Sequence, residues 1–196
     1  MGIGTKAAAA AVATIMGASA LLAGTSTATA APAPSVSGKA VLTWNAKCPS
    51  MTQSLRPVVP AKGTRGGAVL PVTAATGKQI TLGGAFQFYT PGIDTPQALF
   101  ADPQISFAGT NAGNFVVTLT AGSAVTTKVP LIHIANFKKV SVNAKTRQWT
   151  GVLQAPLKGT KAVDAASIAS LLSGMCRADI FPGDTLGSIT VTAKSS

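Results

Sequence analysis

The sequence predicts a mainly β protein, built as a single-domain antiparallel β-sandwich or small barrel with one packed α-helix near the C-terminus. Short runs rich in Val, Thr and Ile recur along the chain, and turns of Gly, Pro and Asn separate them. Within several runs, apolar and polar residues alternate with the period of a half-buried strand. Only residues 164–175 show a helical period. Many short strands with one helix favour a sandwich or a barrel.

The longest predicted element is a β-hairpin over residues 128–157, with its turn at residues 143–146. One register places apolar pairs on one face of the hairpin, namely Val140 with Trp149, Ile134 with Ala155 and Ile132 with Leu157. The other face then holds His133, Lys139, Gln148 and Gln154, together with the apolar pair Phe137 and Val152. A shift of one residue would exchange the two faces.

The remaining elements are shorter. Residues 50–64 are expected to form a loop with at most a helical turn near 51–55, and Pro71 marks its strand as an edge strand. Asp164 is a suitable N-cap for the helix, whose apolar stripe is Ile168, Leu171, Leu172 and Met175. Further strands are expected at 39–46, 66–74, 79–82, 85–89, 104–108, 114–120 and 188–193.

The N-terminal residues have the composition of an export signal. Residues 1–30 combine the basic Lys6, an apolar run and a small-x-small site at 28–30, so we expect a cleaved signal peptide. Residues 31–37 are expected to be a flexible Pro/Ala tether, and 38–196 a single β-rich domain. No second apolar segment could span a membrane after cleavage. The predicted localisation is secreted or cell-surface.

Cys48 and Cys176 are the two cysteines of the chain. Export to an oxidising compartment predicts that they form a disulfide. Two buried free thiols are the alternative. A metal site is not expected, because the chain has no Cys-x-x-Cys motif and one histidine.

The chain is strongly basic, with a formal net charge of +11 and no glutamate. For an exported protein this favours an anionic glycan or cell-wall polymer as partner, and no nucleic acid is expected. The alternative is that the charge serves solubility, since most lysines are dispersed. One local cluster stands out as a candidate binding patch: Lys138, Lys139, Lys145 and Arg147.

Residues for acid–base catalysis are few: one His, one Tyr and five acidic residues, all Asp. Asp179 and Asp184 flank a predicted turn, so a glycosidase-type carboxylate pair is a weaker interpretation than two turn residues. The sequence lacks a nucleophile elbow, a phosphate-binding loop and a zinc-protease motif. We therefore predict no catalytic residues, no resident cofactor and no enzyme activity.

Two side chains are candidate ligand contacts. His133 lies on the predicted polar face of the hairpin, where a haem iron, a metal or a pH-dependent partner could reach it, although a histidine bonded to a neighbour is the simpler interpretation. Tyr89 shares a strand face with Gln87 and could stack on a sugar.

Leu42-Thr43-Trp44 in an early strand, with the Gly/Phe pattern of the later strands, resembles the haem-transport-associated (Htaa) domains of bacterial surface proteins. In those domains a Tyr haem ligand follows the Trp closely. Residues 45–55 contain no Tyr, so the resemblance does not supply that ligand here.

The leading interpretation is an exported, non-enzymatic binding or structural domain that associates with anionic surface polymer. An extracellular carrier of haem or another apolar small molecule, with His133 and Tyr89 near the site, is the alternative, and a hydrolase using His133 is a third. The oligomeric state stays open.

Overall fold

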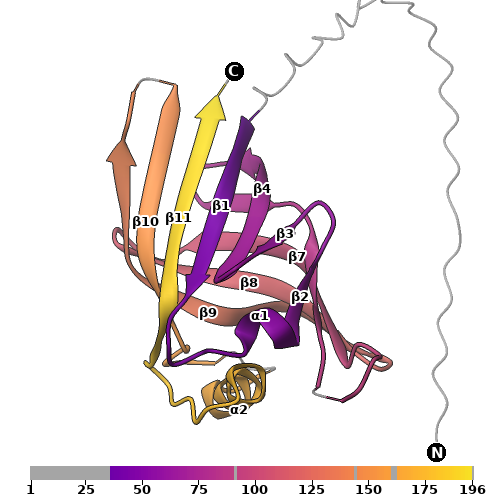
Figure 1. Ribbon diagram of the computed structural model, residues 1–196. Helices are drawn as coiled ribbons and strands as arrows, with labels where there is room; N and C mark the ends of the chain where they lie inside the picture. The colour runs from indigo at the N-terminus through magenta and orange to yellow at the C-terminus, as the bar shows by residue number, and fades with distance from the viewer. Residues whose placement is uncertain (1–35, 91, 144, 160–162, 196) are drawn as a thin grey trace, which may run out of the picture. The chain divides into compact units, whose positions relative to one another are not determined.

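The computed structural model describes residues 36–195 except 91, 144 and 160–162 (Figure 1). The predicted signal peptide and most of the predicted tether lie outside the described residues, and the first strand begins at Val36 rather than at the predicted Lys39. The elements in chain order are β1 (Val36–Trp44), α1 (Met51–Ser54), β2 (Leu55–Val58), β3 (Lys62–Thr64), β4 (Gly67–Ala75), β5 (Gln79–Leu82), β6 (Ala85–Phe88), β7 (Ala98–Phe107), β8 (Ala112–Ala121), β9 (Ala124–Ser141), β10 (Thr146–Gln154), α2 (Ala165–Cys176) and β11 (Thr185–Ser195).

The strands form an antiparallel barrel, which is the second of the two predicted architectures. Pairing runs from β7 through β5, β4, β1, β11, β10 and β9 to β8, and a β7–β8 pairing closes the ring. Closure leaves these eight strands without a free edge. Outside the ring, β6 pairs with β7, β2 with β6 and β3 with β4.

Strand β7 pairs with two strands along the same edge. Its N-terminal half pairs with β6 and its C-terminal half with β5, and the register shifts between Ala101 and Gln104. Asp102 has a φ of 49° there, a left-handed conformation that Asp tolerates better than most residues. Pro103 follows it inside the irregularity. The predicted strand began only at residue 104, because a bulge with Pro resembles a turn in the sequence.

Strand β4 lies inside the barrel between β1 and β5, so the prediction of an edge strand was wrong. The carbonyl of Pro71 accepts a bond from the Gly83 N–H just beyond the end of β5. In an antiparallel strand the nitrogen and carbonyl of one residue face the same neighbour, so the missing N–H of Pro71 also falls beyond the β5 ladder. The proline therefore interrupts no regular pairing.

The β9–β10 hairpin exists, but its predicted register was wrong. Near the turn Trp149 pairs with Lys139 and Gln148 with Val140, one residue away from the predicted register. A register shift between Thr150 and Val152 then changes the pairing in the rest of the hairpin. Asn136, with a φ of 52°, lies in this irregular stretch. The part of β9 nearest the turn therefore exchanges faces relative to the prediction: Phe137 is buried, whereas Val140 is 49% exposed. Ile134 and Trp149 stay buried, as predicted.

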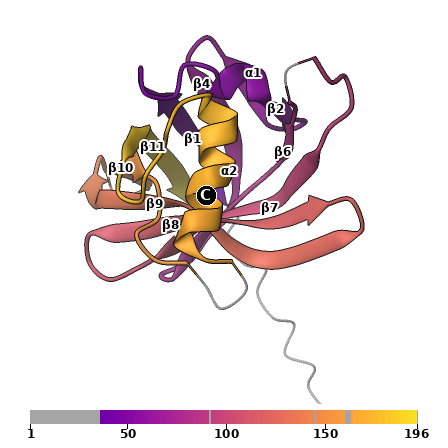
Figure 2. The ribbon, with the colours of Figure 1, turned by 90° about the horizontal axis from the view of Figure 1, so that it is seen from below.

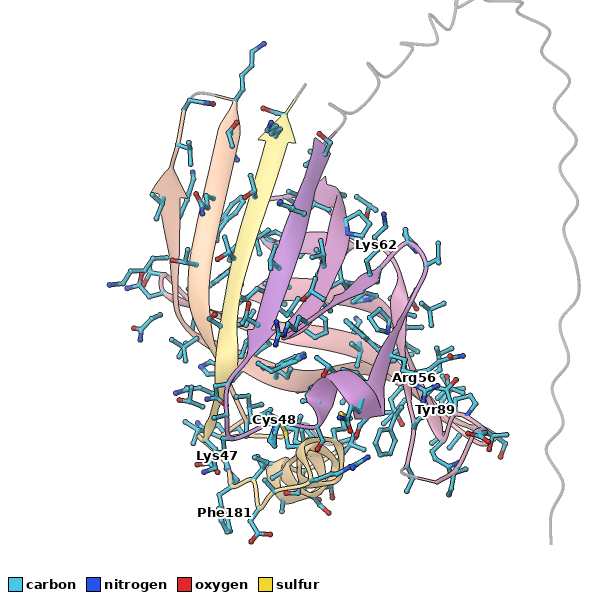
Figure 3. The ribbon with its side chains drawn as sticks, in the orientation of Figure 1. Lys47, Cys48, Arg56, Lys62, Tyr89 and Phe181 are labelled. Atoms are coloured by element: carbon cyan, nitrogen blue, oxygen red, sulfur yellow. A yellow bond between two sulfur atoms is a disulfide. The ribbon has the colours of Figure 1, made fainter. Side chains whose placement is uncertain are left out.

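Helix α2 lies across one end of the barrel, which Figure 2 shows from below. Asp164 caps it by accepting the Ser167 N–H at 2.8 Å, as predicted. The helix runs past Gly174 and ends at Arg177, which is left-handed. The predicted disulfide between Cys48 and Cys176 is confirmed, and it ties the end of α2 to the segment between β1 and α1 (Figure 3).

The barrel interior is filled by side chains. Phe86, Phe100 and Phe115 are among its largest fully buried groups. A second aromatic group, Phe107 with Phe137 and Trp149, packs towards the end of the barrel opposite α2. These side chains pack against one another in the described part of the barrel interior. The two pockets considered below lie on the outside of the barrel and at the end opposite α2.

Candidate ligand-binding site

A pocket of about 490 Å³ opens on the outside of the barrel, where β8 and β9 meet the segment that follows β10. This size is typical of small-molecule sites. The residues that line it are Asn114, Lys128, Pro130, His133, Pro156, Leu157, Lys158 and Gly159. We call it the His133 pocket.

Strand pairing positions the two polar groups of the pocket. Asn114 of β8 and His133 of β9 are direct cross-strand partners, so their side chains project on the same face. Their neighbours Phe115, Ile132 and Ile134 are buried and point to the barrel interior. His133 is half-buried on the outer face, as its predicted position on the polar face required.

His133 Nδ1 lies 3.1 Å from Asn114 Oδ1. In the tautomer that carries its proton on Nδ1, His133 donates this hydrogen bond, because an amide oxygen can only accept. Nε2 then keeps its lone pair and can accept a hydrogen bond or bind a metal ion. An oxygen that holds Nδ1–H in this way is the usual partner of a metal-binding histidine.

The walls of the pocket are apolar. Pro130 comes from β9, and Pro156 and Leu157 directly follow β10, whose Gln154 is the other strand partner of His133. Hydrogen bonds between the backbones of Ala155 and residues 183–184 hold this segment. Leu157 was predicted to be core, but it is 66% exposed at the pocket rim. Leu157 therefore adds apolar surface at the rim of the pocket.

Two lysines add positive charge to the pocket. Lys128 and Lys158 are exposed, and no ion pair involves either of them within the described part of the chain. Lys128 has a φ of 56°, a left-handed conformation that is costly for an ordinary residue. Sequence analysis missed both lysines, and it missed Asn114, because only the pairing of β8 with β9 brings them to His133.

Tyr89 does not join this pocket. Its hydroxyl donates to Gln87 Oε1 at 3.1 Å, and the guanidinium carbon of Arg56 lies 4.2 Å from its ring centre. Figure 3 shows Arg56 of β2 and Tyr89, which follows β6, side by side. Because the guanidinium already covers one face of the ring, the predicted sugar-stacking surface is reduced to the other face.

The predicted basic patch is divided between two faces. Lys139 pairs with the buried Trp149, whereas Lys138 pairs with Thr150 and so projects on the opposite face. Arg147 and Lys145 line a separate pocket of about 170 Å³ at the open end of the barrel. The four cations therefore do not form one continuous surface.

The acidic residues near α2 have structural partners. Asp184 forms an ion pair with Lys47 at 2.8 Å and accepts the Phe181 N–H at 2.8 Å, and these two contacts hold the pKa of its carboxyl below the ordinary value. Hydrogen bonds from Ser167 lower the pKa of the capping Asp164 in the same way. Among the described residues, no three His, Cys, Asp or Glu side chains group as metal ligands.

Within the same residues, no helix is long and apolar enough to cross a membrane.

The chain folds as a β-barrel domain with a pocket on its outer side. Two solved structures have similar folds. The heme binding protein HtaB of Corynebacterium glutamicum aligns with a TM-score of 0.53 and 14% identity, over 84% of this chain and 96% of HtaB. The C-terminal domain of HtaA from the same organism aligns with a TM-score of 0.53 and 15% identity, over 83% of this chain and 99% of that domain. No family model and no curated protein matches the sequence.

At sequence identities of 14% and 15%, the similarity to HtaB and to the HtaA domain shows a shared fold and no more.

Proposed function

We propose that this protein is an exported, non-enzymatic carrier of a flat apolar ligand with acidic groups, of the haem class, which binds in the His133 pocket. The observation that carries the proposal is the contact between His133 Nδ1 and Asn114 Oδ1, because it leaves Nε2 available in a pocket with apolar walls. The ligand is cargo rather than a resident cofactor.

Each part of the pocket matches one part of a haem. Neutral imidazole is a common axial ligand of haem iron, which His133 Nε2 could supply. Pro130, Pro156 and Leu157 offer apolar surface to the porphyrin ring. Lys128 and Lys158 could pair with the two propionate carboxylates. No other described histidine competes for the iron, since the chain has one.

The comparisons support this ligand class at the level of the fold. HtaB is described as a heme binding protein, and its fold covers most of this chain. The Tyr expected after Trp44 from the Htaa resemblance is missing from residues 45–55, so a different ligand is needed here. We assign that role to His133. The expected export signal and the Cys48–Cys176 disulfide agree with a carrier that acts outside the cell or on its surface.

Titration of residues 31–196, which contain the whole of β1, with haemin tests the proposal. Wild type should give a saturable Soret shift, and His133→Ala should weaken binding at least tenfold and move the Soret maximum. Gln148→Ala, on β10 away from the pocket, is the matched control and should bind as wild type does. Identical spectra and dissociation constants for wild type and His133→Ala would rule out iron ligation by His133.

Metal-free protoporphyrin separates the ring from the iron. His133→Ala should bind it within about twofold of wild type, because the apolar walls remain. Replacing both lysines, Lys128→Gln with Lys158→Gln, should weaken haemin and protoporphyrin alike, since both ligands carry the carboxylates. A double variant that binds both ligands as wild type does would remove the lysines from the site.

A further inference from the structure

The end of the barrel opposite α2 is open and carries a second group of cations. We propose that this end, the barrel mouth, binds an acidic polysaccharide by receiving one charged sugar unit. The barrel mouth is the pocket of about 170 Å³ that includes Val36, Ala75, Lys145, Arg147, Trp149 and Ala193. It lies where β1 begins and β11 ends, at the top of Figure 1.

The strand register gives the mouth an apolar floor and a cationic rim. Arg147 pairs with the buried Ala193, and Trp149 pairs with the buried Val191, so these side chains share the inner face of the barrel. Lys139 pairs with Trp149 and lies on that face too. Arg147 and Lys139 are exposed whereas Trp149 is 6% exposed, so the two cations stand at the rim above it.

The cations of the mouth lack acidic neighbours. Lys78 lies in the β4–β5 turn beside the mouth residues Ala75 and Thr76, and Lys194 lies near the end of β11. Three of the five Asp residues lie at α2 or the turn after it, Asp102 lies in the middle of β7, and Asp94 lies in the loop after β6. One end of the barrel is therefore positive without compensation among the described residues, which attracts polyanions.

The dimensions of the mouth favour a sugar unit over a porphyrin. A pocket of about 170 Å³ is smaller than ordinary drug-sized sites. Its mixed lining, with Trp149 and Val36 beside Arg147, suits a ring that has a C–H face and one acidic group. The Arg147 guanidinium can bind a carboxylate or sulfate with two parallel hydrogen bonds.

A second hollow indicates a chain rather than a single anion. Lys145 also lines a shallow depression with Thr146 and Lys194 on the far side of the β10–β11 rim. Thr146 and Lys194 are strand partners, and they project outward because the next pair, Arg147 and Ala193, projects inward. A polyanion that crosses the rim at Lys145 could contact both the mouth and this depression.

The barrel mouth and the His133 pocket are separate sites. His133 pairs with Gln154 at one end of β10, whereas Arg147 lies near the other end. Seven residues of strand separate the two positions by roughly 20 Å. The proposal for the mouth therefore does not depend on the carrier function, and either can fail alone.

Binding of polygalacturonate to residues 31–196, which keep Val36 at the mouth, tests the proposal, with dextran as the uncharged control. The double variant Lys139→Gln with Arg147→Gln should bind polygalacturonate roughly tenfold more weakly than wild type. The control with the same change of net charge is Lys62→Gln with Arg65→Gln, at exposed positions in and just after β3, which should stay within about twofold. Because all four side chains are exposed, both variants should keep the wild-type melting temperature.

Salt and competing ligands complete the test. We assume that about three cations contact the polysaccharide and that it releases counterions as single-stranded nucleic acid does. The affinity for polygalacturonate should then fall roughly 100-fold between about 0.05 M and 0.5 M salt. Equal losses in the two double variants, or tight binding that is unchanged at high salt, would overturn the proposal. Affinity for phosphatidylglycerol vesicles or duplex DNA equal to that for polygalacturonate would also overturn it, because binding at the mouth would then depend on charge alone.

Discussion

Replacement of Asn114 tests how the His133 ring is held. Asn114→Ala removes the oxygen that contacts His133 Nδ1 at 3.1 Å and leaves the imidazole and its strand position unchanged. Loss of such a supporting contact usually weakens metal binding 10- to 100-fold, which corresponds to about 1.4–2.7 kcal/mol. The free energy of unfolding should change less, by about 0.5–1.5 kcal/mol, because the hydrogen bond is neutral and half-exposed.

The assay is haemin titration followed at the Soret band, with thermal unfolding as the stability measurement. Asn114→Asp keeps an acceptor oxygen beside the ring and should bind haemin at least as well as wild type. Asn111→Ala, at an exposed position before β8, is the matched control and should change nothing. If Asn114→Ala bound haemin with wild-type affinity and spectrum, the tautomer argument for Nε2 would be refuted.

Three further predictions concern stability. Removing the disulfide by Cys48→Ala with Cys176→Ala, which opens a loop spanning a sequence separation of 128, should lower the free energy of unfolding by about 5 kcal/mol in urea; a loss below about 1 kcal/mol would contradict this. Asp184→Asn, which breaks the ion pair with Lys47, should lower the free energy of unfolding at neutral pH. The pKa of Asp184 is lowered in the folded state, so this loss relative to wild type should disappear as the pH falls below about 4. A loss that persists at pH 2 would count against the ion pair. Asn136→Val should cost about 1–2 kcal/mol because its φ of 52° excludes a β-branched residue, and a neutral effect would mean that the bulge is not required.

Much of the fold could be predicted from short sequence patterns, because helix caps, strand alternation and a single cysteine pair depend on few residues. Asp164 caps its helix, Cys48 pairs with Cys176, and the apolar positions Ile134, Leu153 and Trp149 are buried. Each of these depends on a short period, a cap or the one possible cysteine pair. The hairpin register depends on bulges in β9 and β10, and a bulge has no clear sequence signal when Asn rather than Gly adopts the left-handed conformation.

The candidate site was less predictable than the fold. His133 was recognised as an outward-facing side chain, yet its partner Asn114 lies in another strand and reaches it only through the β8–β9 register. Lys158 comes from the segment after β10, and Lys128 depends on a left-handed backbone. The four residues of the predicted basic patch do not share one surface, because the alternation of side chains along β9 places Lys138 and Lys139 on opposite faces.

The position of the iron in a haem complex shows whether His133 holds the ligand in the His133 pocket. A crystal of the haemin-loaded domain, measured at the iron absorption edge, gives an anomalous peak that marks the metal without relying on side-chain density. We expect one strong peak within bonding distance of His133 Nε2, between Lys128 and Lys158. A peak elsewhere on the barrel, or a haem in the pocket with its iron away from His133, would contradict it.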